Sequence, residues 1–357
     1  MMIRAHRDFE IQEVGKVKKL FSVIVCCALI LALTGCQPKE PTVYEASFLT
    51  LFDTVTVLKG SAESREAFEE TARAAQEDLT HYHQLFDVYN DYEGLNNLKT
   101  VNDMAGVAPV AVEKPIIDLL KDCRSYYELT GGKVNVAMGG VLKLWHDARD
   151  AGINDPANAK LPDMATLEAA AEHISFDAVI IDEAASTVYI SDPQVRLDVG
   201  AVAKGWAAQR VAETLPSNML LSVGGNVCAT GPKTPEGTPW VIGVQNPEGA
   251  GDSYLHTLYV TGGSYVTSGD YQRAYTVDGK LYHHIIDPDA LMPSAYWRSV
   301  TVVCDDSGLA DALSTALFVL PREEGQKLLD SCGAMAMWVD SQGNIFYSPG
   351  FEELIRT

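Results

Sequence analysis

An acid and a hydroxyl lie four residues apart in the stretch Asp311-Ala312-Leu313-Ser314-Thr315-Ala316-Leu317, whose other residues are small or apolar. Residues at this spacing share one face of a helix, so the stretch predicts a buried helix that presents Asp311 and Thr315 on one side. Two such oxygens converging in apolar surroundings form half of a site for a hard cation. The same residues also suit a plain packed helix, in which Thr315 is a β-branched core residue.

Two glycine-containing segments upstream carry further polar groups. In residues 196–206, Asp198 ends an expected strand and Gly200 opens a helix that contains Lys204. The amides after Gly200 predict an anion-receptive helix N-terminus, and Lys204 adds a cation in its first turn. Residues 222–226 (SVGGN) follow an apolar strand, and two glycines let a backbone approach a ligand closely. Both segments also suit ordinary turns, and neither matches a generic nucleotide-binding motif.

Two adjacent histidines lie in a strand expected over Tyr282–Ile286. His283 and His284 point to opposite faces of such a strand, so we expect one of them to face a cleft and do not expect both to chelate one metal. Asp287-Pro288 favours a turn directly after them. A lone strand histidine is also often a structural group, and that alternative stays open.

Long helices early and many strands later predict the α+β class. The longest expected helix covers residues 62–86 and ends in an aromatic and amide-rich loop that could bind a planar heterocycle. The sequence predicts one strand over residues 48–58 and a polar surface loop over residues 147–162. Further elements are expected as a helix opened by Pro115, a hairpin over 176–191, and helices over 201–215, 309–319 and 322–331.

The N-terminus predicts a lipoprotein. Three lysines precede an apolar run that ends in Leu33-Thr34-Gly35-Cys36, which is typical of a signal peptide with a lipid-modified Cys36. The sequence therefore predicts a signal peptide over 1–35, a tether over 36–43 and a single domain over 44–357. We expect attachment at the extracytoplasmic face of the cell membrane. The alternative is a plain signal peptide with an incidental cysteine.

Charge and cysteine content exclude some classes of function. The formal net charge of -21 argues against binding to nucleic acid or anionic lipid headgroups, so membrane attachment would depend on the lipid at Cys36. Cys123, Cys228, Cys304 and Cys332 are scattered without a zinc-ligand spacing, and buried free thiols are the expected state.

In this order along the chain, these segments resemble the ApbE-type FAD:protein FMN transferases. The resemblance runs from Phe52-Asp53-Thr54 to the end and implies a T-fold-like architecture of largely antiparallel sheets packed with helices, with the active site in a cleft between two lobes. The chain departs from the family pattern at residues 289–293, where many relatives carry Thr-Gly-x-Pro, and at Lys133-Val134-Asn135, where a small-aromatic-Asp run is more usual. The matching motifs are residues 198–205, 222–226, 268–271, 284–288 and 311–316.

The resemblance also implies roles for individual residues. Asp311 and Thr315 would bind Mg²⁺ through their side chains, and Ala201 through its backbone carbonyl. For catalysis, we expect His284 as the general base with Asp270 behind it, and Lys204 on the diphosphate. The FAD pocket would contain Phe52, Tyr89, Lys133, Val134, Asn135, Asp198, Lys204 and Ile286.

The implied reaction is Mg²⁺-dependent transfer of FMN from its substrate FAD to a Thr or Ser hydroxyl of an acceptor flavoprotein subunit at the membrane, with release of AMP. Two alternatives remain. One is a Mg²⁺-dependent FAD diphosphatase that gives FMN and AMP, and the other is a lipid-anchored FAD-binding protein. This chain has no obvious acceptor motif of its own, so self-modification is not expected.

Overall fold

The computed structural model describes residues 42–249, 253–271 and 273–356, and the chain from Val43 onward forms one compact unit. The predicted signal peptide, the predicted lipid site at Cys36 and most of the predicted tether lie outside the described residues. Within that described part, no helix is long and apolar enough to cross a membrane.

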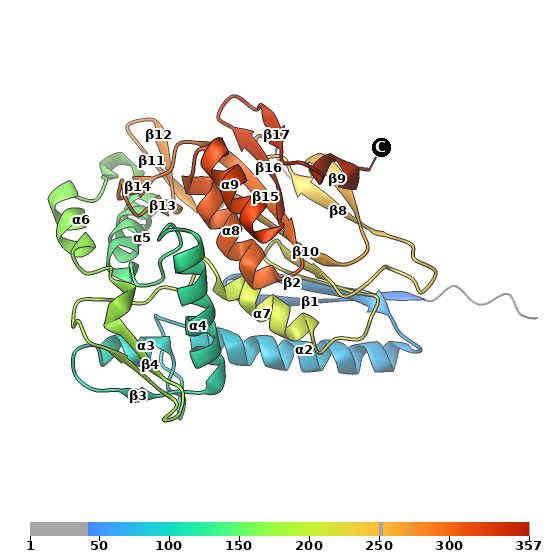
Figure 1. Ribbon diagram of the computed structural model, residues 1–357, viewed down its shortest axis with the longest axis horizontal. Helices are drawn as coiled ribbons and strands as arrows, with labels where there is room; N and C mark the ends of the chain where they lie inside the picture. Colours follow the sequence, from blue (N-terminus) through green and yellow to red (C-terminus); the bar gives the residue numbers. More distant parts are fainter. Residues whose placement is uncertain (1–41, 250–252, 272, 357) are drawn as a thin grey trace, which may run out of the picture. The chain divides into compact units, whose positions relative to one another are not determined.

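The larger part of the fold is built around an eight-stranded sheet (Figure 1). Its strands follow the order β1-β2-β6-β7-β10-β15-β16-β17, and every neighbouring pair is antiparallel. The strands are β1 (Val43–Leu51), β2 (Thr54–Ser61), β6 (Met219–Val223), β7 (Asn226–Ala229), β10 (Gly263–Gly269), β15 (Trp297–Cys304), β16 (Met335–Asp340) and β17 (Ile345–Tyr347).

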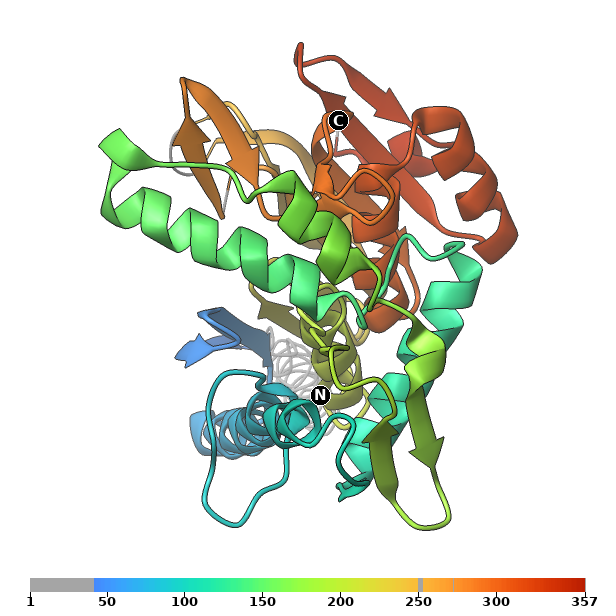
Figure 2. The ribbon, with the colours of Figure 1, turned by 90° about the vertical axis from the view of Figure 1, so that its left-hand side faces the viewer.

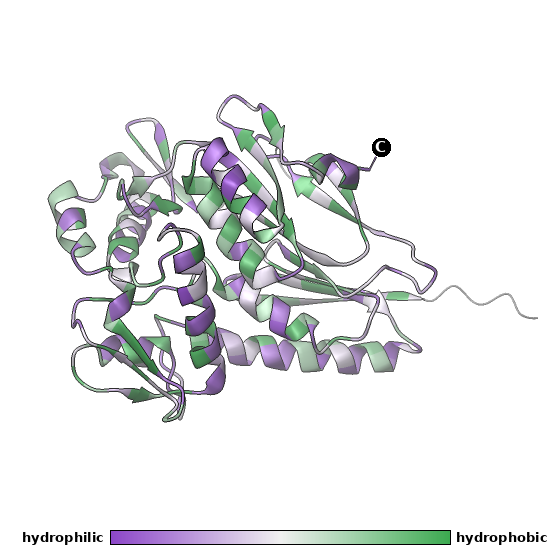
Figure 3. Ribbon diagram, in the orientation of Figure 1, coloured by the Kyte–Doolittle hydropathy of each residue, from purple (hydrophilic) through white to green (hydrophobic). Residues whose placement is uncertain are grey.

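Helices cover one face of this sheet and a hairpin covers the other. The helices are α2 (Arg65–Phe86), α7 (Ala203–Ala212), α8 (Ser307–Val319) and α9 (Arg322–Cys332). Figure 3 shows alternating hydrophilic and hydrophobic stripes on α2, as a helix with one exposed side requires. Helix α8 is buried on nearly every side, since it packs against both α7 and strands β10 and β15. The hairpin of β8 (Trp240–Gln245) and β9 (Tyr254–Val260) packs on the opposite face.

The remaining elements form a smaller region beside the sheet. One part is a three-stranded sheet with helices, and the other has α5 and α6 packed against short hairpins; Figure 2 shows α5 running past β11 and β12. The elements are α3 (Leu98–Asp103), β3 (Val110–Ala111), α4 (Lys114–Leu129), α5 (Gly139–Asn154), α6 (Met164–Ala171), β4 (Val179–Asp182), β5 (Thr187–Ile190), β11 (Ala274–Val277), β12 (Lys280–His283), β13 (Ile286–Asp287) and β14 (Met292–Pro293), with 3-10 turns at Pro156–Asn158, Phe176–Ala178 and Phe351–Leu354.

The predicted α+β class is confirmed, and two local predictions are wrong. Residues 48–58 form parts of two strands, because the chain reverses at Phe52 and Asp53 with left-handed backbone angles that no glycine signals. Residues 147–154 continue α5, so the polar surface loop begins only after Asn154. The cysteines of the described part are free thiols, as expected.

Candidate active site

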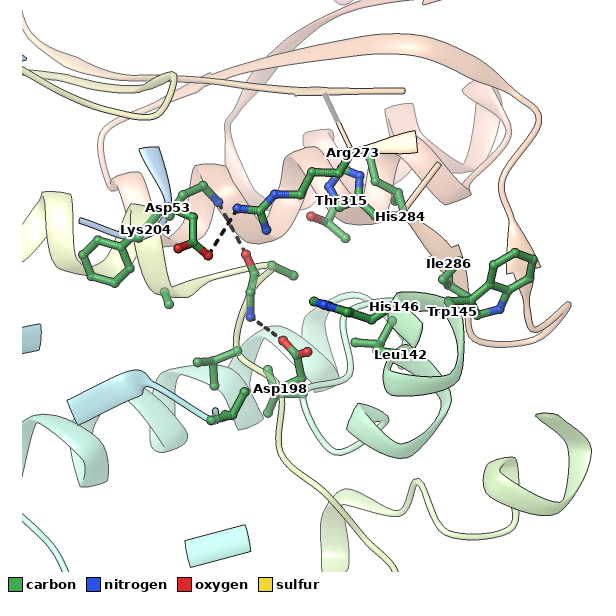
Figure 4. A pocket seen from close by; sticks show the side chains of 18 of the residues that line it. Asp53, Leu142, Trp145, His146, Asp198, Lys204, Arg273, His284, Ile286 and Thr315 are labelled. Carbon is green, nitrogen blue, oxygen red and sulfur yellow. Dashed lines mark hydrogen bonds and ion pairs between the residues drawn. The ribbon is translucent and has the colours of Figure 1, made fainter. Parts of the chain in front are cut away.

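A cavity of about 680 Å³ lies between the large sheet's helices and the smaller region (Figure 4). This volume falls within the roughly 300–1,000 Å³ of typical small-molecule and cofactor sites. Within the described part of the chain, every predicted site residue except Asp270 lines it. These are Phe52, Tyr89, Lys133, Val134, Asn135, Asp198, Ala201, Lys204, His284, Ile286, Asp311 and Thr315.

The acid of the opening stretch is deeply buried in the floor of this cavity. Helix α8 begins after Asp306, whose side chain accepts the Leu309 N–H, and it carries Asp311 and Thr315 to the cavity one turn apart. Asp311 is only 3% exposed. Burial raises the pKa of its carboxyl, and the nearby Lys204 ammonium, with Nζ 3.7 Å from Oδ2, acts in the opposite direction. A bound cation would supply further positive charge at this carboxylate.

The start of α7 is adapted to this carboxylate. The Gly205 N–H is one of the first amides of α7, which have no partner within the helix, and it donates to Asp311 Oδ2 at 2.8 Å. Ala201 precedes the N-cap residue Val202, so its carbonyl is not needed for the hydrogen bonds of α7, and Ala201 lines the cavity together with Asp311 and Thr315. A side chain at position 205 would collide with the Ser307 carbonyl and with Asp311, so glycine permits this close approach of α7 to α8.

These donors fit a hard cation. Asp311, Thr315 and the Ala201 carbonyl offer oxygen atoms only, which is the donor type that Mg²⁺ prefers, and they leave room for water and phosphate oxygens. Across residues 42–249, 253–271 and 273–356, no group of three His, Cys, Asp or Glu side chains could hold a metal. A site with one carboxylate is consistent with that finding, and it would depend on ligand oxygens to complete it.

The glycine turn before α7 places charge at the cavity, but the Gly200, Val202 and Ala203 amides donate within the protein, so the predicted anion-receptive helix N-terminus is not formed by them. The carboxylate of Asp198 accepts the Gly200 N–H at 2.8 Å, and Lys204 Nζ lies 3.4 Å from the Gly200 carbonyl. Lys204 therefore lies between that carbonyl and Asp311. Its ammonium is close enough to the floor to meet an anion that a cation there would also bind.

The stretch Lys133-Val134-Asn135 borders the cavity with its side chains mostly engaged elsewhere. Lys133 Nζ pairs with Asp287 Oδ1 at 2.9 Å and with Asp289 Oδ2 at 2.8 Å. Val134 is buried, and the Asn135 amide donates to the Ile174 carbonyl at 2.8 Å. A ligand would therefore meet mainly the backbone of this stretch. The exposed Tyr89 and the buried Ile286 line other parts of the cavity.

The two histidines have different roles. His283 Nε2 donates to the Ser294 carbonyl and its Nδ1 accepts the Ile285 N–H, so its ring is fully engaged. His284 Nδ1 is buried and has no hydrogen-bond partner among the described residues. Burial, followed by the charge of Arg273, lowers the pKa of His284 to about 3. His284 is therefore a neutral imidazole at neutral pH, and it lines the cavity.

Among the described residues, Asp270 is the one predicted site residue that does not line the cavity. Strand β10 ends at Gly269, and the turn that follows directs Asp270 toward Arg298, whose Nε lies 2.7 Å from Oδ2. Asp270 thus forms part of an ion pair with β15. This pairing engages Oδ2 of Asp270, and its role behind His284 stays a prediction.

Several cavity residues were missed by the sequence reasoning. One helical face of α5 lines the cavity, and Asp53 and Arg273 lie at its rim. These α5 residues have helical spacing, but the sequence predicts a polar surface segment from residue 147 onward, which hides the continuous helical face. The missed residues of α5 are Leu142, Trp145, His146 and Arg149.

Comparisons with known proteins agree on one family. The model of the ApbE family matches residues 48–338. A FAD:protein FMN transferase of Klebsiella pneumoniae is 33% identical over 251 residues, covering 68% of this chain and 75% of the relative. One from Treponema pallidum is 32% identical over 277 residues, covering 72% of this chain and 75% of the relative.

Solved structures show the same fold. An ApbE protein of Thermotoga maritima matches with a TM-score of 0.77 and 30% identity, covering 88% of this chain and 100% of that one. The apo flavinyl transferase ApbE of Pseudomonas stutzeri matches with a TM-score of 0.74 and 22% identity, covering 89% and 98%.

Proposed function

This chain belongs to the ApbE family of flavin transferases, and on that premise we propose that it transfers FMN from FAD to a Ser or Thr hydroxyl of an acceptor flavoprotein and releases AMP. It is an enzyme of the transferase class, as its sequence predicted. The observation that carries the finer proposal is the meeting of three oxygen donors, Lys204 and the unpaired His284 in one cavity.

The reaction needs placement and neutralisation of charge more than covalent help from the enzyme. The acceptor oxygen attacks the FMN-side phosphorus, and the bond from that phosphorus to the bridging oxygen of the diphosphate breaks. AMP leaves with that oxygen, and FMN becomes a phosphoester of the acceptor. Lys204 would hold the diphosphate oxygens, because the Val202 and Ala203 amides after Gly200 already donate to the Val199 carbonyl.

We propose Mg²⁺ as the cation, held by Asp311, Thr315 and the carbonyl of Ala201. When bound it would withdraw electron density from the diphosphate and stabilise the leaving phosphate. The Gly205 N–H keeps Asp311 Oδ2 oriented, so the carboxylate is positioned before any ligand arrives. Oriented donors of this kind lower the cost of reaching the transition state.

His284 is our candidate for the base that takes the acceptor proton. A pKa of about 3 makes it a weak base in the ligand-free protein, because it is buried near the positive charges of Arg273 and Lys204. An anionic diphosphate beside those cations would offset their charge and raise this pKa. Substrate binding would therefore strengthen the base when it is needed.

The transfer itself is tested by mass spectrometry of candidate acceptor flavoproteins after incubation with this enzyme, FAD and Mg²⁺. We expect an added FMN phosphoryl group on one Ser or Thr, and none when Asp311→Ala replaces the wild type. The absence of any adduct with wild-type enzyme across these acceptors would contradict the proposal.

A second incubation separates transfer from hydrolysis. Without an acceptor protein, a transferase should release AMP slowly, because water would have to replace the acceptor hydroxyl. Rapid AMP release under those conditions would instead identify a diphosphatase. Tight FAD binding without AMP release, even with acceptors present, would identify a flavin-binding protein.

We also propose that a lipid on Cys36 holds the enzyme at the extracytoplasmic face of the cell membrane, near its acceptors. The support is the sequence Leu33-Thr34-Gly35-Cys36 at the end of an apolar run. Cys36→Ser should move the protein from the membrane fraction to the soluble fraction after cell breakage. Unchanged membrane association of this variant would count against the lipid anchor.

A further inference from the structure

Two charged side chains face each other across the rim of the cavity. Arg273 Nη2 lies 3.9 Å from Asp53 Oδ2, and Figure 4 shows the arginine reaching across toward that carboxylate. Asp53 belongs to the turn between β1 and β2, whereas Arg273 precedes β11. Their side chains are 83% and 49% exposed, so an incoming ligand can reach both.

The backbone places Asp53 at the rim in an unusual conformation. Phe52 and Asp53 have φ values of 51° and 54°, which non-glycine residues rarely adopt. The turn is tied to α2, since the Phe52 N–H donates to His83 Nδ1 at 3.3 Å. Strained turns of this kind concentrate at ligand sites, where the surrounding structure maintains them.

Arg273 also lies close to the groups that would act on the substrate. Among nearby charges it has the largest effect in lowering the pKa of His284. Figure 4 shows its guanidinium between Asp53 on one side and the His284 and Thr315 side chains on the other. The guanidinium is thus near both a carboxylate at the rim and the expected position of a diphosphate above the floor.

We propose that Arg273 exchanges the Asp53 carboxylate for the diphosphate of FAD when the substrate binds. Arg273 is then a positioning residue for the diphosphate, and Asp53 competes with the substrate for it. A guanidinium binds phosphate oxygens in a planar, two-pronged geometry that a carboxylate also satisfies. The exposed ion pair contributes only a factor of about two to five to an equilibrium constant, so a dianionic diphosphate can displace it. The inference rests on FAD being the substrate.

The exchange predicts opposite effects at the two positions. FAD is titrated into the full-length enzyme without divalent cation or acceptor, so that it stays intact, and binding is followed by flavin fluorescence. Arg273→Gln should bind FAD about 10- to 100-fold more weakly, the usual range for a lost hydrogen bond to a charged group. Asp53→Asn should bind it about two- to five-fold more tightly, because the competitor is gone.

The double variant and a phosphate-free ligand distinguish the proposed exchange from effects of net charge or of pocket shape. The variant carrying both changes should bind FAD like Arg273→Gln alone, since Asp53 acts only through the arginine. Riboflavin, which has no phosphate, should bind all variants equally. Arg65→Gln and Glu69→Gln break another exposed ion pair, on α2, and control for the change in net charge.

Three results would overturn the exchange. The first two are unchanged FAD binding by Arg273→Gln, and FAD binding by Asp53→Asn that is no tighter than that of the wild type. A fall in riboflavin affinity that matches the fall for FAD would also overturn it, since the arginine would then shape the pocket as a whole. These outcomes are independent of the proposed function. If the wild-type enzyme binds FAD but transfers no FMN, the proposed function fails. The FAD titrations of the variants still test whether Arg273 exchanges Asp53 for the diphosphate.

Discussion

The floor of the cavity, where α7 meets α8, and its rim, where Asp53 faces Arg273, hold charged groups in opposite ways. In the floor, Asp311 is 3% exposed and accepts a backbone hydrogen bond from Gly205 at 2.8 Å. At the rim, the Asp53 side chain is 83% exposed and its partner lies 3.9 Å away. Buried, closely packed groups tolerate little change, whereas exposed pairs contribute little to stability. The floor should therefore govern folding and catalysis, and the rim should govern binding.

The largest effect is expected at the carboxylate of the floor. Asp311→Asn keeps the shape of the side chain and an oxygen for the Gly205 N–H, so the fold should persist. The variant loses the charge that would bind the cation, and the rate of FMN transfer should fall by at least about 1,000-fold. The measurement is single-turnover transfer with saturating FAD, alongside circular dichroism.

The matched control for this prediction is Asp306→Asn. Asp306 caps the same helix, α8, and Asn caps a helix about as well as Asp. This variant should transfer FMN at close to the wild-type rate. Equal activity of the Asp311 and Asp306 variants would show that the buried carboxylate has no special role.

The second effect concerns the close contact between the two helices of the floor. In Gly205→Ala the new methyl group meets the Ser307 carbonyl and Asp311, so the free energy of unfolding should fall by about 1–3 kcal/mol. Gly140 is also helical, but an added Cβ there meets no atom of the described residues within 4 Å. Gly140→Ala should instead stabilise the protein by about 0.5–1 kcal/mol. Urea unfolding measures both, and a similar loss in the two variants would contradict the packing argument.

The third effect is a pH dependence of the free energy of unfolding that arises from His283, which lines the cavity. Burial lowers the pKa of His283, so below about pH 6.5 the unfolded chain binds a proton that the folded ring does not. Stability should thus decline as the pH falls, by at most about 1.4 kcal/mol per pH unit for this group. His283→Gln should lower stability at neutral pH, because it alters two hydrogen bonds, yet flatten the slope. Urea unfolding between pH 7 and pH 5 checks this, and an unchanged slope in His283→Gln would contradict it.

The contrast between floor and rim also explains which site residues the sequence could predict. The floor residues lie in short local motifs, where helical spacing and glycine chemistry indicate Asp311, Thr315 and the turn before Lys204. The rim pair joins positions 53 and 273, and no local pattern relates two loops so far apart. The pairing of Asp270 with Arg298 likewise joins two segments far apart in the sequence, so no local pattern indicates it.

For the fold, too, local sequence patterns predict single elements but not the contacts between distant segments. Its class and most helices were readable from the hydrophobic stripe of α2, the proline near the start of α4 and the apolar run of α8. The hairpin of β1 and β2 was not, because its reversal uses Phe52 and Asp53 in a conformation that normally requires glycine. Tertiary contacts such as the bond from Phe52 to His83 stabilise that turn, and they have no signature in the local sequence.

The smallest effect is expected at this turn, where two neighbouring positions share one backbone conformation. Asp53 has a φ of 54° and Gly224 has a φ of 58°. A Cβ at Gly224 would lie 2.6 Å from Thr54 Oγ1, so Gly224→Ala should lower the free energy of unfolding by about 2 kcal/mol or more. Asp53 is open to solvent, and in Asp53→Gly the relief of backbone strain offsets the greater freedom of glycine in the unfolded chain. Its unfolding free energy should therefore stay within about 0.5 kcal/mol of the wild type in urea. A large change at Asp53 would mean that the rim, too, helps to hold the fold together, and the division between floor and rim would not stand.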